Sequence, residues 1–186
     1  MKTRRPILFA AAATVTVAAA SLVYSRSRRR APLAVVEHVD LARYMGVWYE
    51  IARLPTRFEK GCQHVTAEYT LRPDGKVTVV NSCRKGSPTG SLEIVRGVAR
   101  VVDSATNAKL KVSFFWPFEG DYWILDLDPE YQYVLVGEPG RENLWLLSRT
   151  PQLAQPVREQ LIAVAQAAGF PTEKLIFTSQ PATSLT

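Results

Sequence analysis

The sequence has little of what metal centres and nucleophilic enzymes require. Its 186 residues include only two histidines, His38 and His64, and two cysteines. It contains no Gly-x-Ser-x-Gly elbow, no phosphate-binding loop and no cluster with metal-ligand spacing. We therefore expect no catalytic residue, no metal and no cofactor.

Acidic side chains are absent from the first 30 positions, which carry seven of the 23 Lys and Arg residues. The net charge of +6 therefore belongs to this segment, because the remainder holds 16 basic and 17 acidic residues. Without a basic stripe in the body of the chain, we expect no nucleic acid partner.

One long charge-free run, ILFAAAATVTVAAASLVY, occupies residues 7–24 between two basic flanks. It predicts that residues 1–30 are a signal peptide or an N-terminal membrane anchor. Small residues at 18–21 suit cleavage, eighteen apolar residues just suffice to span a bilayer, and Arg4-Arg5 loosely resembles a twin-arginine export signal. We expect a cell-envelope protein, periplasmic or membrane-anchored, with the membrane as a partner through this segment.

Residues 31–42 are expected to form a linker and an N-terminal cap, and apolar and polar residues then alternate with a period of two. The alternation predicts strands over 47–53, 63–71, 76–83, 91–102, 109–116, 121–127, 131–137 and 143–149. Short connections rich in Gly, Pro and Asp indicate antiparallel neighbours. The pattern predicts an all-β, eight-stranded antiparallel up-and-down barrel, with an open two-sheet sandwich as the alternative.

A single helix is expected after the last of these strands. Thr150 is a candidate N-cap, and Leu153, Val157, Leu161, Val164 and Ala168 share one face. Pro156 is awkward inside a helix, so the regular part can begin only there. A short final strand at 174–179 and a tail at 181–186 complete the chain.

The two cysteines flank a predicted hairpin. Cys62 and Cys83 bracket two alternating runs that turn around residues 73–75, which brings them to nearly opposite positions. The spacing predicts a disulfide and hence an oxidising compartment, with two unrelated buried thiols as the alternative.

Three segments resemble the signatures of the lipocalin family. GVWYEIARLP (46–55) is similar to the first, LWLLSRTP (144–151) to the third, and LDLDPEYQYVLVG (125–137) stands where the weaker second falls. The resemblance covers about residues 38–180. It implies that Gly46 lets the chain turn into the first strand, and that Trp48 closes the barrel floor with Arg149 against it.

The resemblance also implies a ligand cavity and its guest. From strand parity we expect the cavity residues to be Val65, Ala67, Tyr69, Val79, Phe114, Trp123, Tyr133 and Trp145. The implied function is binding, storage or transport of amphipathic lipids, fatty acids or lysophospholipids, for envelope maintenance. The alternative is a lipocalin-fold enzyme acting on a lipidic substrate.

The resemblance also has implications for the oligomeric state and the location of the protein. The resemblance makes a homodimer one option. Within the family the chain is most similar to bacterial outer-membrane lipoproteins, whose signal peptide ends in a lipidated cysteine, but residues 1–30 contain no cysteine. An uncleaved anchor or a soluble periplasmic protein would then take the place of a lipid-attached one.

Overall fold

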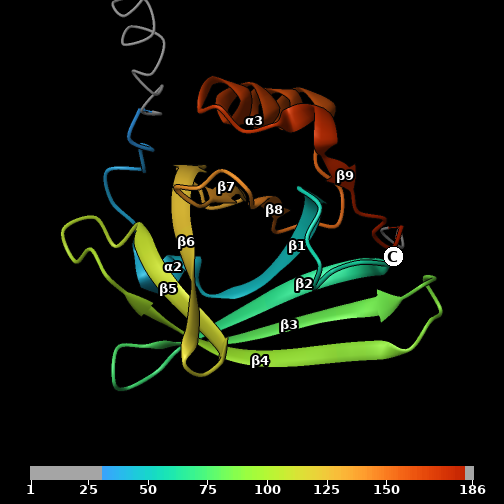
Figure 1. Cartoon of the computed structure of the whole chain (residues 1–186), viewed down its shortest axis with the longest axis horizontal. Helices are drawn as coiled ribbons and strands as arrows, with labels where there is room; N and C mark the ends of the chain where they lie inside the picture. Colours follow the sequence, from blue (N-terminus) through green and yellow to red (C-terminus); the bar gives the residue numbers. More distant parts are fainter. Residues whose placement is uncertain (1–30, 183–186) are drawn as a thin grey trace, which may run out of the picture. The chain divides into compact units, whose positions relative to one another are not determined.

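A computed structural model describes residues 31–182, and within them nine antiparallel strands form one sheet. The strands are β1 (Gly46–Arg53), β2 (Cys62–Leu71), β3 (Val77–Lys85), β4 (Leu92–Val101), β5 (Lys109–Phe115), β6 (Phe118–Leu127), β7 (Tyr133–Gly137), β8 (Leu144–Ser148) and β9 (Ile176–Phe177). The strands from β2 to β8 pair in sequence order, and β1 pairs with both β8 and β2. The first eight strands therefore close into the predicted up-and-down barrel (Figure 1).

The C-terminal segment, β9 and the residues after it, fills a gap that the barrel leaves between β1 and β2. These two strands pair only over residues 46–49 of β1, and β9 then pairs with Ala52 and Arg53. The His64 amide donates to the Ser179 carbonyl at 2.8 Å. The Gln180 side-chain amide donates to the carbonyls of Glu50 and Val65, both at 2.8 Å. The C-terminal segment thus joins two strands that no longer pair with each other.

Helix α3 (Gln155–Ala167) begins later than Thr150. The Thr150 hydroxyl donates to the Gln152 carbonyl at 2.7 Å, so the prediction that this residue caps the helix is wrong. Pro156 lies in the first turn of α3, where its missing N–H would have no partner in the helix. A 3-10 turn, η1 (Thr172–Lys174), then leads to β9, which is shorter than the predicted strand at 174–179.

Apolar side chains are buried on both faces of the strands beside α3. In β8, Leu147 packs inside the barrel, whereas Leu144 and Leu146 pack outside with Leu161 and Ala165 of α3. In Figure 1, α3 lies beside β7 and β8, on the outer face of the sheet. These strands therefore lack the simple alternation of a sheet with one solvated face.

A short helix, α2 (Leu41–Tyr44), precedes β1 at the closed end of the barrel. Asp40 caps it, because its carboxylate accepts from the amides of Ala42 at 2.9 Å and Arg43 at 3.3 Å. The Asp40 amide in turn donates to the Tyr131 hydroxyl at 2.9 Å. The Asp40–Tyr131 bond joins the start of α2 to the β6–β7 connection.

None of the helices within residues 31–182 is long and apolar enough to cross a bilayer. The predicted signal peptide or anchor at 1–30 lies outside the described residues, as do positions 183–186 of the predicted tail.

The predicted disulfide is present in the β2–β3 hairpin. Cys62 and Cys83 are bonded, with their Cα atoms 5.5 Å apart. Both half-cystines are buried and pack against Val65. The bond ties the start of β2 to the end of β3, at the end of the hairpin opposite its turn.

We expect the Cys62→Ala/Cys83→Ala variant to lose about 2–4 kcal/mol in free energy of unfolding. The bond closes a loop of 21 residues, and the unfolded chain gains conformational freedom when the loop opens. Urea unfolding of the oxidised wild type and the variant measures the difference. Thiol titration in denaturant should find no free thiol before reduction and two after it, and equal counts would contradict the bond.

Candidate ligand cavity

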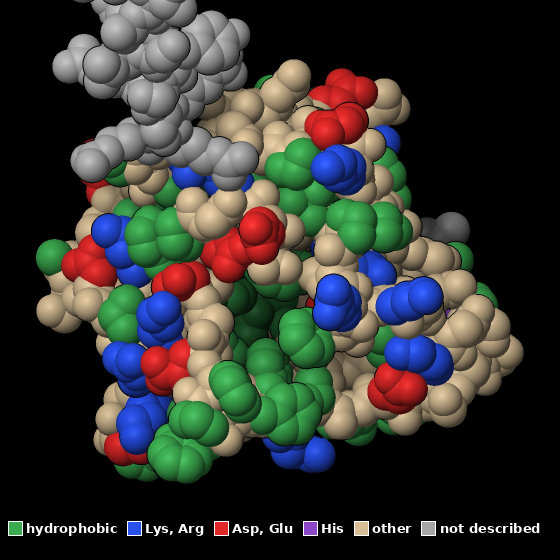
Figure 2. Space-filling model, viewed as in Figure 1, with side chains coloured by type: hydrophobic (Ala, Val, Ile, Leu, Met, Phe, Trp, Pro, Cys, Tyr) green, Lys and Arg blue, Asp and Glu red, His purple; other side chains and the backbone are tan. Residues whose placement is uncertain are grey.

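The inner face of the barrel is apolar and aromatic, and it narrows toward one end. Solvent does not reach Trp48, Ile124, Val134 or Val136, whereas Ala67, Val112, Phe114 and Trp145 are half-buried. Figure 2 shows a hollow walled by hydrophobic side chains. We call its open end the mouth, where the β1–β2, β3–β4, β5–β6 and β7–β8 connections lie, and the opposite end the floor.

Trp48 and Arg149 lie together at the floor. The Trp48 indole N–H donates to the Tyr44 carbonyl at 2.9 Å, and the Arg149 guanidinium carbon lies 3.9 Å from the centre of the indole. The same guanidinium donates to the carbonyls of Val47 at 2.9 Å and Arg43 at 2.8 Å. Gly46 has a φ of +93°, which favours glycine, and any Cβ there would lie 3.4 Å from an Arg149 nitrogen.

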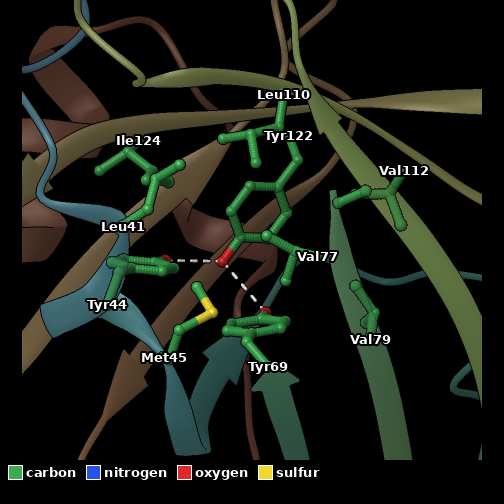
Figure 3. A pocket seen from close by; sticks show the side chains of 11 residues that line it. Leu41, Tyr44, Met45, Tyr69, Val77, Val79, Leu110, Val112, Tyr122 and Ile124 are labelled. Carbon is green, nitrogen blue, oxygen red and sulfur yellow. Dashed lines mark hydrogen bonds between the residues drawn. The ribbon is translucent and has the colours of Figure 1, made fainter. Parts of the chain in front are cut away.

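Three tyrosines lie above this floor, and their hydroxyl groups are linked by hydrogen bonds (Figure 3). The Tyr122 hydroxyl lies 2.7 Å from that of Tyr44 and 3.1 Å from that of Tyr69. The rings of Tyr44 and Tyr69 are stacked, with centroids 5.8 Å apart. The small void beside them, about 20 Å³, is lined by Leu41, Tyr44, Met45, Tyr69, Val77, Val79, Ala99, Leu110, Val112, Tyr122 and Ile124. Such a volume accommodates about one water, so the deepest part of the barrel is filled by side chains.

Burial raises the pKa of Tyr44, Tyr69 and Tyr122 well above the ordinary value of 10. All three hydroxyls therefore stay neutral, and together they form a small polar spot in an apolar wall. Sequence parity identified Tyr69 but missed Tyr44 and Tyr122. Tyr122 was missed because its neighbour Trp123 was assigned to the cavity. Only one of two adjacent strand residues can face inward.

Asn81 adds a second polar group to the inner wall. It lies opposite Ala67 on β2 and Val95 on β4, on the same face of β3 as Val79. Its buried side-chain oxygen has no hydrogen-bond partner among residues 31–182. This oxygen is an acceptor that a ligand or a water can satisfy.

A buried ionic cluster lies farther toward the mouth. Arg53 donates to the Glu50 carboxylate at 2.7 Å, and its Nε lies 3.1 Å from the Glu59 carboxylate. Its remaining nitrogen donates to the Glu59 carbonyl at 2.7 Å. Thr178, next to β9, donates to Glu50, and the Trp145 indole N–H donates to Glu59 at 3.3 Å.

Burial sets the charge state of this cluster. It raises the pKa of Glu50 to about 7, with Glu59 adding to the rise and Arg53 opposing it. Burial also raises the pKa of Glu59, again against the pull of Arg53. Two carboxylates therefore depend on one guanidinium. Sequence reasoning missed this arrangement, because its members come from β1, the β1–β2 connection, β8 and the residue after β9.

The structure places six of the eight predicted cavity residues on the inner face of the sheet. Tyr69 and Val79 are buried in the inner core, with Ala67, Phe114 and Trp145 partly buried against it. Val65 shares the parity of Ala67 and packs against the disulfide near the mouth.

The two remaining residues, Trp123 and Tyr133, do not line the cavity. Both pack in the outer cluster with Leu135 and the α3 residues, and Trp123 lies under the Lys109 ammonium at 4.8 Å. The inner positions are Tyr122 and Ile124 on β6. The prediction was wrong because α3 buries the outer face here, so large apolar residues occupy both parities.

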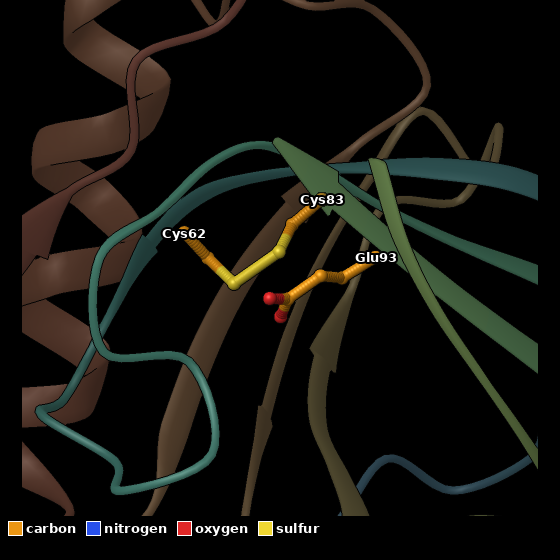
Figure 4. Close-up of side chains that lie close together, drawn as sticks. All are labelled: Cys62, Cys83 and Glu93. Carbon is orange, nitrogen blue, oxygen red and sulfur yellow. A yellow bond between two sulfur atoms is a disulfide. The ribbon is translucent and has the colours of Figure 1, made fainter. Parts of the chain in front are cut away.

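Cys62, Cys83 and Glu93 place their potential ligand atoms within 4.8 Å of one another (Figure 4). The two sulfurs are bonded to each other, so neither is a thiolate that could bind a metal or attack a substrate. A lipocalin-fold enzyme, the alternative function, could therefore use neither cysteine as its nucleophile.

Comparison with known proteins agrees with this geometry. The family model of the lipocalin-like domain matches residues 39–180. The chain is a lipocalin. It is 44% identical to the outer membrane lipoprotein Blc of Escherichia coli over 167 residues, which cover 88% of this chain and 93% of the relative. It is 41% identical to temperature-induced lipocalin-1 of Arabidopsis thaliana, covering 80% of this lipocalin and 83% of the plant protein.

Among solved structures, the lipocalin aligns with insecticyanin from the tobacco hornworm Manduca sexta with a TM-score of 0.65. The alignment covers 82% of this chain and 86% of insecticyanin at 21% identity. This likeness supports the barrel fold alone. Binding of a small hydrophobic ligand is the activity with which the fold and the relatives are consistent.

Proposed function

We propose that this lipocalin binds amphipathic lipids with a single acyl chain, fatty acids or lysophospholipids, for storage or transport in the cell envelope. The observation that carries the proposal is the tapered interior. Its wall is apolar and solvent-accessible near the mouth, while Trp48 and the three tyrosines fill it toward the floor. A chain that enters at the mouth meets a closed end.

The physical chemistry of the wall suits one acyl chain. Burial of about 14 methylenes at ~0.8 kcal/mol each yields roughly 11 kcal/mol before costs. Ordering and association remove several kcal/mol, which leaves an affinity of about micromolar to nanomolar. The polar end of the guest would remain toward the mouth, and the Asn81 oxygen is an acceptor for a hydroxyl or a protonated carboxyl on the way.

The envelope part of the proposal has separate support. The charge-free run at 7–24 with basic flanks predicts export or anchoring, and the disulfide suits an oxidising compartment. The bacterial relative is named an outer membrane lipoprotein.

We expect Ala67→Trp to weaken lysophospholipid binding about tenfold or more, because the new indole occupies the hollow that the acyl chain needs. Ala67 is half-buried on the inner face, directly opposite Trp48. Titration of intrinsic tryptophan fluorescence with monomeric lysophospholipid, checked by native mass spectrometry of the complex, measures the affinity.

Glu68→Trp is the matched control for this test. Glu68 is the next residue of β2 and is exposed on the outer face, so the same indole there should leave the affinity unchanged. Thermal unfolding checks that both variants are folded. Equal lysophospholipid affinity in the two variants, or no saturable binding by the wild type, would contradict the proposal.

A further inference from the structure

The β5–β6 hairpin carries large apolar side chains into solvent at the mouth. Phe115 and Phe118 form its last pair, and Trp116 and Pro117 make the turn between them. The three aromatic residues are 68%, 91% and 76% exposed in sequence order. We call Phe115, Trp116 and Phe118 the aromatic tip. Exposure of these apolar side chains to water is unfavourable in free energy, and such exposed patches mark interaction sites.

Another connection at the same end of the barrel, on the opposite side of the mouth, repeats this chemistry. Phe58 in the β1–β2 connection is 87% exposed. In Figure 2, hydrophobic side chains gather along the lower margin of the hollow, where Figure 1 places the turn between β5 and β6. The exposed aromatic side chains thus lie around the opening through which a guest would enter.

Cations accompany the aromatic side chains on part of the mouth. Arg57 directly precedes Phe58 in the chain and Lys60 follows it by two positions. Arg84 lies near the end of β3. Within residues 31–182, the ion pairs found do not involve any of these three residues, which we call the cationic rim. The β7–β8 connection is different, because it carries Glu138 and Glu142. On the β1–β2 and β3–β4 side, Glu59 is paired with Arg53 and Glu93 with Lys85, so the cationic rim leaves an excess of positive charge there.

We propose that the mouth docks on an anionic phospholipid bilayer, with the aromatic tip inserted in the interface and the cationic rim on the headgroups. Tryptophan and other aromatic side chains favour the headgroup level of a bilayer. Lys and Arg near the surface add attraction to anionic lipids. One surface thus satisfies both features.

A bilayer fits the shape of this surface better than a second copy does. A stable protein interface buries about 800 Å² on each partner with close complementarity. The aromatic tip is instead the narrow end of a two-stranded hairpin, and its side chains project into solvent. A fluid interface can accommodate such a projection without a matching pocket.

In this orientation the barrel opening faces the bilayer, which would supply the lipid ligand. The inference rests on the proposed function to the extent that the guest is a membrane lipid. A single-chain lipid could then pass between the bilayer and the hollow without crossing bulk water, where exposing its chain is unfavourable.

The test uses the full chain with vesicles of phosphatidylglycerol and phosphatidylcholine whose acyl chains carry bromine, which quenches tryptophan on contact. Residues 1–30 contain no tryptophan, so the emission does not report on that segment. We expect strong quenching of the wild type and loss of most of it in Trp116→Phe. In Phe115→Ser/Phe118→Ser, which keeps Trp116 as the reporter, the quenched fraction should fall about threefold or more.

Two controls isolate the surface. Leu71→Ser/Val102→Ser removes exposed apolar side chains at the floor end and should leave the quenching unchanged. Arg57→Ser/Lys60→Ser should reduce quenching on anionic vesicles but not on pure phosphatidylcholine, and added salt should mimic it.

Each outcome decides the matter. Undiminished quenching in Phe115→Ser/Phe118→Ser would overturn the docking surface. So would a tip variant that only converts a dimer to a monomer in light scattering, which would assign the tip to a second copy. Monomeric lysophospholipid binding is measured alongside, and its loss with docking intact would refute the proposed function while leaving the docking surface in place.

Discussion

Replacing Trp48 with alanine is expected to lower the free energy of unfolding by about 3–5 kcal/mol. The indole is fully buried at the floor, and the substitution removes its hydrogen bond to the Tyr44 carbonyl and its contact with the Arg149 guanidinium. Arg149 would then lie beside a cavity. Urea unfolding followed by circular dichroism measures the change without relying on the tryptophan signal.

Trp116→Ala provides the matched control, because it removes the same side chain from a position that is 91% exposed. Its effect on unfolding should lie within about 0.5 kcal/mol of zero. Similar losses in the two variants would show that Trp48 does not stabilise the floor in the way its contacts indicate.

We expect Arg53→Met to destabilise the protein by about 3–5 kcal/mol at pH 8, because it leaves two buried carboxylates without their shared cation. Arg53 and Glu50 are almost fully buried, and Glu59 is mostly so. Adding Glu50→Gln to Arg53→Met should restore part of the loss. Lys85→Met, which breaks only the exposed pair with Glu93, should cost less than about 1 kcal/mol.

The pH dependence of unfolding gives a second readout of this cluster. The pKa of Glu50 is about 7 in the folded protein against an ordinary value of 4.5, so the folded state binds more protons between these values. The free energy of unfolding of the wild type should therefore fall as pH rises from about 4.5 to 7 and level off above. Glu50→Gln should flatten this slope, and the penalty of Arg53→Met should shrink at pH 5.5. A penalty that does not change with pH would contradict the shared role of Arg53.

Alternation in the sequence predicted most of the barrel because one face of many strands meets solvent. On β2, for example, Ala67 and Tyr69 face inward and the exposed Glu68 faces outward, so a period of two identifies the inner residues. The disulfide followed from the same local geometry, since both cysteines belong to one hairpin.

The same reasoning failed where a distant element covers the outside of the sheet. Adjacent β6 residues Tyr122 and Trp123 are both large and partly buried, one within the barrel and one with the outer cluster. Nothing within the strand distinguishes them, because α3 removes the polar face that would fix the parity. The sequence-based cavity list was wrong at this strand and at Tyr133 for that reason.

The sequence by itself determined the lipocalin signatures, the order of the strands and the hairpin disulfide, because each depends on residues close together in the chain or on a repeated local pattern. Tertiary structure alone decided the inward side of β6, the tyrosine trio above Trp48 and the ionic cluster. Glu50 and Thr178 in that cluster stand 128 positions apart. Their contact arises only when the C-terminal segment fills the gap beside β1, and no local pattern records where a chain returns.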